Sequence, residues 1–181
     1  MATLGVLALQ GGFEAHQRAA ESLGHRTRRV RTPEDLQDLD GLILPGGEST
    51  VMLKLATLGG LDAPLDAFVR SGRPVLATCA GLILAARTVL GPAQRSFGWL
   101  DVTVRRNGWG RQLDSFEGTA DDTTVPLVFI RAPRIEAVGD VEVLLRLNGE
   151  PVMVRQGRVF GATFHPELTS DLRIHRQVFG T

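Results

Sequence analysis

Short, almost uninterrupted apolar segments recur along the first half of the sequence, and a small-residue turn and a helical pattern follow each of them. Apolar runs of this length are typical of strands that are covered on both faces, as in parallel sheets. When helices alternate with such strands, the connections are right-handed and the product is a doubly wound α/β sheet. On this basis we predict strands at Leu4–Leu9, Gly41–Leu44 and Val75–Thr78, and helices at Phe13–Leu23, Val51–Leu58 and Asp62–Arg70.

The remaining elements are predicted from weaker signals. Polar Arg26–Arg31 suits an edge strand, Thr32-Pro33 suits a helix start, and Asn148-Gly149 is a hairpin turn signal. After about Gly91 strand-like segments crowd together, and a last helix is expected from Ser170 to about Val178. We therefore expect one domain over residues 1–181, a three-layer α/β fold whose mainly parallel sheet has a late antiparallel extension. The late strands predicted are Leu100–Arg105, Leu127–Ile130, Val141–Leu147, Val152–Arg155 and Val159–Phe164.

Charge and cysteine content limit the classes of function. Basic and acidic residues number 20 each, so the whole chain offers no charge argument for binding nucleic acid or an anionic membrane. A single cysteine excludes an internal disulfide framework and a cysteine-based zinc cluster, and it suits a reducing, cytoplasmic setting. The N-terminus lacks a basic leader, and no apolar run approaches membrane-spanning length. We expect no metal site and no cofactor.

The single cysteine, Cys79, directly follows the predicted strand Val75–Thr78 and precedes Ala80, Gly81 and the apolar helical run Leu82–Ala86. A strand that turns sharply into a helix lifts a thiol from the sheet edge and aims it along a helix N-terminus, where the thiolate is favoured. A buried core cysteine fits the same pattern, since free cysteine is among the most buried residue types.

Of the four histidines, His165 is the one that a cysteine nucleophile could use as a base. It follows the predicted strand Val159–Phe164, so it ends at the same sheet edge as Cys79, and Glu167 lies two residues further on to fix its tautomer. The alternative is an ordinary loop histidine beside a solvated carboxylate. His16 and His175 fall within helices and are expected on polar faces, and His25 is expected at the surface.

A glycine pair provides the third element of the predicted site. Pro45-Gly46-Gly47-Glu48-Ser49-Thr50 follows the predicted strand Gly41–Leu44 and opens a helix, which brings it to the same edge. Paired glycines let backbone N–H groups approach a ligand and stabilise an oxyanion. The segment lacks the phosphate-loop spacing and its lysine. A plain turn with Ser49 or Thr50 capping the helix is the structural alternative.

Six stretches together resemble class I glutamine amidotransferases, and specifically the family of glutaminase subunits of pyridoxal 5′-phosphate synthase, the PdxT/SNO family. The resemblance covers the whole chain and is highly specific because all six occur in the family's order. They are Leu7–Gly11, Pro45–Thr50, Thr78–Ile83, Gly110–Glu117, Phe129–Pro133 and Phe164–Leu168. The family usually has Asn-Ser-Phe-Gly-Arg-Gln where this chain has Asn107-Gly108-Trp109-Gly110-Arg111-Gln112, so we expect altered packing near the cleft and retained activity.

The resemblance implies a role for each matching residue. Cys79 would be the nucleophile, His165 the general base and then acid, and Glu167 its orienting carboxylate. The backbone N–H groups of Gly47 and Ala80 would form the oxyanion hole. The implied glutamine contacts are Gly47, Glu48, Ser49, Arg106, Ile130 and Arg131. An arginine at such a site also suits the α-carboxylate of an amino acid, because guanidinium is a forked donor.

The resemblance further implies that L-glutamine is the substrate and that the ammonia passes to a separate synthase subunit (PdxS/SNZ-like). Gln10 and Gly11, at the end of the first predicted strand, are expected to couple docking of that partner to the oxyanion loop, and an ordinary loop amide at Gln10 is the alternative. Two alternatives stay open: the glutaminase of another amidotransferase or a stand-alone cysteine hydrolase, and a non-catalytic binding module of the synthase.

Overall fold

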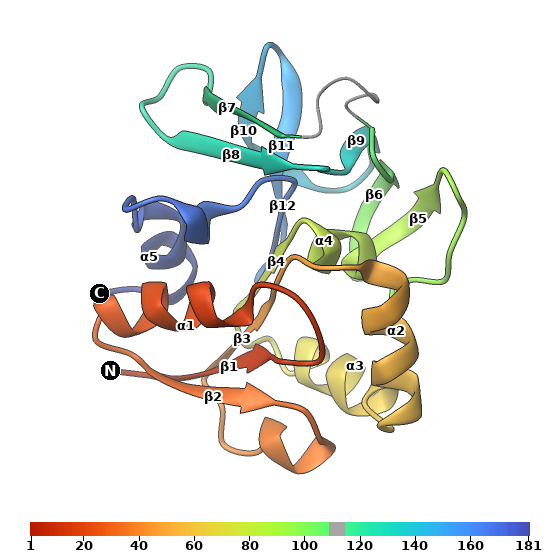
Figure 1. Ribbon diagram of the computed structural model, residues 1–181, viewed down its shortest axis with the longest axis vertical. Coiled ribbons are helices and arrows are strands. Elements are labelled where there is room, and N and C mark those ends of the chain that lie inside the picture. The colour runs from red at the N-terminus through yellow and green to blue at the C-terminus, as the bar shows by residue number, and fades with distance from the viewer. Residues whose placement is uncertain (109–114) are drawn as a thin grey trace.

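A seven-stranded sheet forms the centre of the protein, as seen in a computed structural model that describes residues 1–108 and 115–181 (Figure 1). The predictions for Trp109 and for the first part of the stretch Gly110–Glu117 concern residues 109–114, which lie outside the described residues. The strand order is β10-β11-β12-β4-β3-β1-β2. In chain order these strands are β1 (Thr3–Leu7), β2 (Arg26–Val30), β3 (Gly41–Leu44), β4 (Val75–Thr78), β10 (Glu142–Leu147), β11 (Glu150–Gln156) and β12 (Val159–Ala162).

The pairing directions confirm the predicted mainly parallel α/β sheet. β12, β4, β3, β1 and β2 pair in parallel, whereas β10 and β11 extend the sheet in antiparallel fashion. Every residue of β3, β4 and β12 is buried, as expected of strands covered on both faces. The predicted Asn148-Gly149 turn joins β10 to β11, and both of its residues have positive φ, 51° and 80°.

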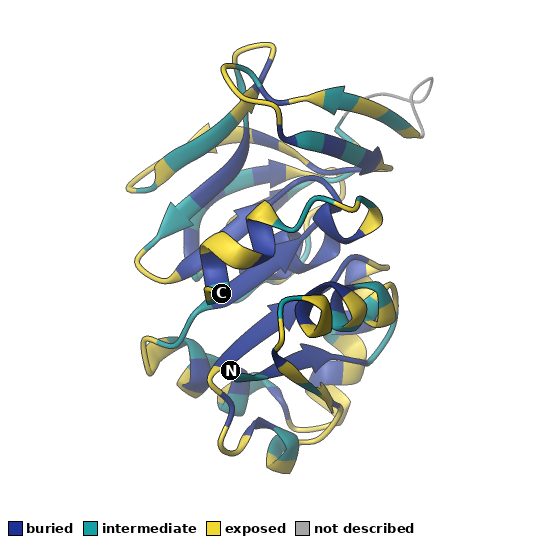
Figure 2. Cartoon of the chain, turned by 90° about the vertical axis from the view of Figure 1, so that its left-hand side faces the viewer, coloured by how far each residue is buried: buried dark blue, intermediate teal, exposed yellow. Residues whose placement is uncertain are grey.

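Helices cover both faces of this sheet and create two apolar layers. One layer contains Met52, Leu65 and Leu82, and the other contains Ala20 and Ile174. Figure 2 shows the central strands buried and the outward sides of the helices exposed. On the first face lie α2 (Ser49–Leu58), α3 (Asp62–Arg70) and α4 (Ala80–Ala85), and on the second lie α1 (Phe13–Ser22) and α5 (Arg173–Phe179).

Several predicted boundaries differ from the structure. The predicted helix start at Thr32-Pro33 gives only the 3-10 turn η1 (Pro33–Leu36), which a capping box between Thr32 and Asp35 closes. The last helix begins at Arg173 and not at Ser170, because Asp171 first folds back to accept hydrogen bonds from Arg173. No helix in the described ranges is long and apolar enough to cross a membrane.

Three strands lie outside the sequence prediction, and they complete two smaller sheets above the C-terminal edge of the central sheet (Figure 1). The predicted helical run through Ala86 is wrong at its end, because Ala86 already begins a strand. The three unpredicted strands are β5 (Ala86–Leu90), β7 (Ser115–Thr119) and β9 (Arg134–Val138), and their partners are β6 (Leu100–Arg105) and β8 (Pro126–Ile130).

Candidate active site

Most of the predicted site residues lie at the C-terminal edge of the parallel sheet. β12 pairs with β4 so that Ala162 lies opposite Thr78, and the chain leaves these strands toward His165 and Cys79 at the same edge. A pocket of about 480 Å³ opens there. The predicted residues that line it are Gln10, Gly47, Glu48, Ser49, Cys79, Arg106, Ile130, Arg131, His165 and Glu167. Ala80 and Gly11 are not among the lining residues.

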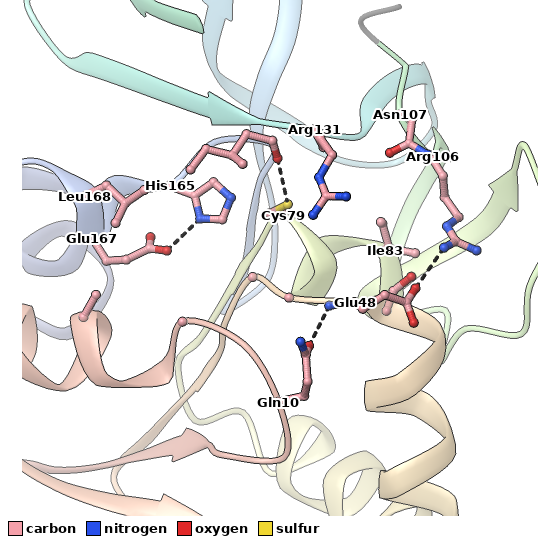
Figure 3. A pocket seen from close by; sticks show the side chains of 16 residues that line it. Gln10, Glu48, Cys79, Ile83, Arg106, Asn107, Arg131, His165, Glu167 and Leu168 are labelled. Carbon is pink, nitrogen blue, oxygen red and sulfur yellow. Dashed lines mark hydrogen bonds and ion pairs between the residues drawn. The ribbon is translucent and has the colours of Figure 1, made fainter. Parts of the chain in front are cut away.

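Cys79 occupies a strained turn between β4 and α4. Its backbone has φ 47° and ψ −103°, a conformation that costs a non-glycine residue of order 1–3 kcal/mol and that recurs at functional sites. The turn is tight because α4 packs closely on β3: a Cβ atom at Gly81 would overlap the carbonyl oxygen of Leu44. Cys79 is 6 % exposed, and its Sγ lies 4.0 Å from the carbonyl oxygen of Ile130 (Figure 3).

His165 lies between this thiol and a carboxylate. Its Nδ1 is 2.7 Å from Oε1 of Glu167, which is the carboxylate–imidazole contact expected from the sequence (Figure 3). Burial alone would lower the pKa of His165, but its hydrogen bonds to Cys79 and Glu167 raise that pKa to about 10. His16 and His165 in turn outweigh burial and lower the pKa of Glu167. The site therefore favours an ionised carboxylate beside a protonated imidazole.

The structure corrects the expectation for the other three histidines, all of which are buried. His16 and His175 have no exposed surface, and their rings meet with Nδ1 of His16 3.0 Å from Nε2 of His175. Nε2 of His16 also lies 3.2 Å from Oε2 of Glu167. His25 is 5 % exposed because the backbone near both chain ends covers it, including the N–H of Ala2 and the carbonyl of Gly180.

The glycine loop packs directly against the imidazole. A Cβ atom at Gly46 would overlap Cε1 of His165, so only glycine allows this approach. The Gly46 carbonyl accepts a hydrogen bond of 3.1 Å from the N–H of Gly12, and the side-chain oxygen of Gln10 accepts one of 2.6 Å from the N–H of Glu48. The predicted coupling segment at Gln10 and Gly11 thus contacts the loop directly.

Glu48, and not Ser49 or Thr50, caps α2. Its carboxylate accepts hydrogen bonds from the N–H groups of Thr50 and Val51, because a β-region backbone at Glu48 turns the side chain back over the helix start. The Ser49 hydroxyl instead donates to the side-chain oxygen of Gln94, at 2.9 Å. These contacts fix the loop end of the pocket.

Charged groups of both signs face the pocket opposite the thiol. Arg106 donates to Glu48 over 3.0 Å, and Arg131 turns its guanidinium inward from a backbone with φ 42° (Figure 3). Although partial desolvation opposes them, the hydrogen bonds from Val51 and Thr50 and the Arg106 charge lower the pKa of the exposed Glu48. A carboxylate and two arginines at one end of a pocket complement an α-amino and an α-carboxylate group.

Two backbone N–H groups were predicted to bind an oxyanion. Ala80 is the first residue of α4, so its N–H has no partner within the helix. Gly47 belongs to the loop between β3 and α2 and lines the pocket. Sequence reasoning assigned no role at the site to five other lining residues: Gly12, Ala15, Ile83, Asn107 and Leu168.

Comparisons with known proteins agree on one family. The model of the SNO glutamine amidotransferase family matches residues 6–179. "Pyridoxal 5′-phosphate synthase subunit PdxT" of Corynebacterium jeikeium is 54 % identical over 180 residues, which cover 95 % of this chain and 92 % of the relative. The protein of the same name from Deinococcus radiodurans is 50 % identical over 188 residues, covering 98 % and 96 %.

Solved structures give the same result at the level of the fold. A crystal structure of a glutamine amidotransferase superimposes with a TM-score of 0.91 at 45 % identity and covers 97 % of this chain and 96 % of its own. A structure of PurLQS from Thermotoga maritima gives a TM-score of 0.70 at 20 % identity over 98 % of both chains, a similarity that concerns the fold alone.

Proposed function

Because this chain belongs to the SNO glutamine amidotransferase family, we propose that it hydrolyses L-glutamine to L-glutamate and ammonia as the glutaminase subunit of a pyridoxal 5′-phosphate synthase. Its relatives at 54 % and 50 % identity carry the name of such a subunit, and they align over nearly their whole length. The observation that carries the chemical part of the proposal is the meeting of Cys79, the His165–Glu167 pair and the Gly46–Gly47 loop in one pocket.

The first half of the reaction forms a thioester. With the proton already on His165, Cys79 attacks the side-chain carbonyl carbon of glutamine as the thiolate. The N–H groups of Ala80 and Gly47 stabilise the oxyanion. The tetrahedral intermediate collapses as His165 returns the proton to the leaving nitrogen, so that ammonia departs and a γ-glutamyl thioester remains.

The second half regenerates the enzyme. A water molecule gives a proton to His165 and attacks the thioester carbonyl, and glutamate leaves as the sulfur regains its electron pair. Glu167 holds Nδ1–H of His165, which keeps Nε2 available for proton transfer on the thiol side and stabilises the imidazolium. Arg131 and the Glu48–Arg106 pair bind the charged α-groups of glutamine, and Ser49 and Ile130 complete the walls.

The ammonia is delivered to a separate synthase subunit (PdxS/SNZ-like), and the reaction takes place in the cytoplasm. Gln10 and Gly11 couple partner docking to the oxyanion loop, since Gln10 already bonds to Glu48 and a Cβ atom at Gly11 would overlap the carbonyl oxygen of Gly46. A partner that moves the β1–α1 turn therefore moves the loop with it.

Substitution of Cys79 by alanine tests the proposal. In the complex with the synthase, Cys79→Ala should abolish glutamate release and glutamine-dependent formation of pyridoxal 5′-phosphate. Formation from added ammonium salt should persist, which controls for assembly of the complex. Glutamine-dependent formation that survives the substitution would leave only a binding module. Full glutaminase activity without the synthase would instead indicate a stand-alone hydrolase.

A further inference from the structure

A chain of buried polar side chains continues behind Glu167, beyond the groups that the proposed reaction uses. Oε1 of Glu167 is hydrogen-bonded to Nδ1 of His165, and its Oε2 lies 3.2 Å from Nε2 of His16. The same Nε2 is 3.0 Å from Oγ1 of Thr78, the residue before the nucleophile. Nδ1 of His16 is 3.0 Å from Nε2 of His175. His16, His175 and Thr78 are completely buried, so solvent reaches none of these contacts.

The unpaired atoms of this chain determine where its protons lie. Both histidines are neutral, because burial lowers the pKa of His16 and lowers that of His175 to about 3. Nδ1 of His175 is buried and has no hydrogen-bond partner in the described chain. A buried N–H without a partner costs about 1–3 kcal/mol, so we place the His175 proton on Nε2, where Nδ1 of His16 accepts it.

This arrangement leaves one tautomer for His16. Its Nδ1 accepts from His175, so its own proton is on Nε2, which is hydrogen-bonded to Oγ1 of Thr78 and lies 3.2 Å from Oε2 of Glu167. The opposite tautomer would turn a lone pair toward the carboxylate and would leave an N–H of His175 buried without a partner. No described residue makes a well-aligned hydrogen bond to Oε2 of Glu167, and Nε2 of His16, 3.2 Å away, is the polar group that faces it.

We propose that His16, held in its Nε2–H tautomer by His175, is a positioning residue that fixes the carboxylate of Glu167 against His165. The proposal rests on the glutaminase function proposed above. The ionisable groups that face His16 are Glu167, His165 and His175. Without the Nε2–H of His16, the buried Oε2 of Glu167 would lose its 3.2 Å polar contact, and the carboxylate would rotate or take up a proton. Either change weakens its hold on Nδ1 of His165.

Three variants assayed in the complex with the synthase test this role. His16→Leu removes the donor, and it should lower kcat for glutaminase about 10- to 100-fold with little change in KM, as losses of orienting groups do. His16→Gln places an amide N–H near the former Nε2 and should recover most of kcat. His25→Gln removes another buried histidine, one away from the pocket, and should leave kcat and KM unchanged.

Nuclear magnetic resonance of the full chain gives readouts that do not depend on activity. The ¹⁵N shifts of His16 should show the Nε2–H tautomer in the wild type. The pKa of His165 should be lower in His16→Leu than in the wild type and close to the wild-type value in His16→Gln. Circular dichroism confirms that each variant is folded.

Two results would overturn the positioning role: an Nδ1–H tautomer for His16, or a folded His16→Leu variant whose kcat and His165 pKa both match the wild type. These results differ from a failure of the proposed function. In that case the wild type itself would release no glutamate in the complex, while the tautomer and the pKa of His165 would still be measurable.

Discussion

Glu167 is the residue on which most of the proposed chemistry depends, because it sets the proton affinity of His165. Glu167→Gln keeps the shape of the side chain and removes its charge. The pKa of His165, raised to about 10 in part by this carboxylate, should fall toward the ordinary value of about 6.5. We expect kcat to decrease about 100-fold or more, in the range usual for loss of general acid–base support.

The pH dependence of kcat should show the direction in which the pKa of His165 changes in Glu167→Gln. Departure of ammonia needs a proton on His165, so the alkaline limb of kcat should move to lower pH when the pKa of His165 falls. Glutaminase rates measured from pH 6 to pH 10 in the complex would show it. The matched control is Glu142→Gln, which removes a surface carboxylate paired with Arg155 and should leave the profile unchanged. An alkaline limb that stays in place in Glu167→Gln would contradict the assignment.

The place of a single residue in the fold could be predicted only where the sequence around it has a recognisable pattern. Cys79 and His165 each follow a short apolar strand, so a parallel sheet had to bring them to one edge. His16 and His175 follow no such pattern, and the prediction of polar helix faces was wrong for both. Their burial is tolerated because partners up to 159 residues away satisfy them. No local rule reveals such long-range partners.

Among the helices and strands, β3, β4 and β12 were predictable because both of their faces are covered. The strands that escaped prediction belong to the smaller sheets. β7 alternates exposed and half-buried residues, and β5 begins at the last turn of a helix and pairs with a register shift. Their pairing depends on partners distant in sequence, which periodicity does not show.

The loop between β3 and α2 provides a test of packing at the site. Gly46→Ala would place a methyl group on Cε1 of His165, so the loop or the imidazole has to move. Displacements of about 1 Å near reacting groups cost up to about 100-fold in rate. We therefore expect kcat/KM for glutamine in the complex to fall by 10- to 100-fold, with the fold retained by circular dichroism.

Gly118→Ala is the control for the loss of glycine flexibility. Gly118 lies in β7, outside the pocket, and a methyl group there would make only ordinary contacts with Leu147. Its kcat/KM should match that of the wild type. If Gly46→Ala keeps full activity, the close approach of loop and imidazole is unimportant for the reaction.

Two buried histidines connect segments of the molecule that lie far apart in the sequence. His16 on α1 and His175 on α5 bring together helices from opposite ends of the chain, and Thr78 ties them to the central strand β4. Both helices contribute to the same apolar layer through Ala20 and Ile174. The stability of this face of the sheet therefore depends on two histidines that stay neutral, and this dependence makes it sensitive to acid.

The sign of the effect follows from the direction of the pKa shifts. Both histidines have a lowered pKa in the folded protein, about 3 for His175, whereas an unfolded histidine titrates near 6.5. The unfolded state therefore takes up protons first, and the stabilisation present above pH 6.5 is lost as the pH falls. His165, whose pKa is raised, is protonated in both states below pH 6.5, and carboxylates contribute only near their own unfolded pKa of about 4.

Between pH 6.5 and pH 4.5 the free energy of unfolding should therefore decrease, by up to about 1.4 kcal/mol per pH unit for His175 and further through the lowered pKa of His16. Urea denaturation at several pH values, followed by circular dichroism, measures this slope. His175→Leu removes one of the two groups and should reduce the slope, while His25→Gln tests whether any buried histidine has the same effect. A free energy of unfolding that is constant across this range, or an unchanged slope in His175→Leu, would show that these rings are not held neutral by burial.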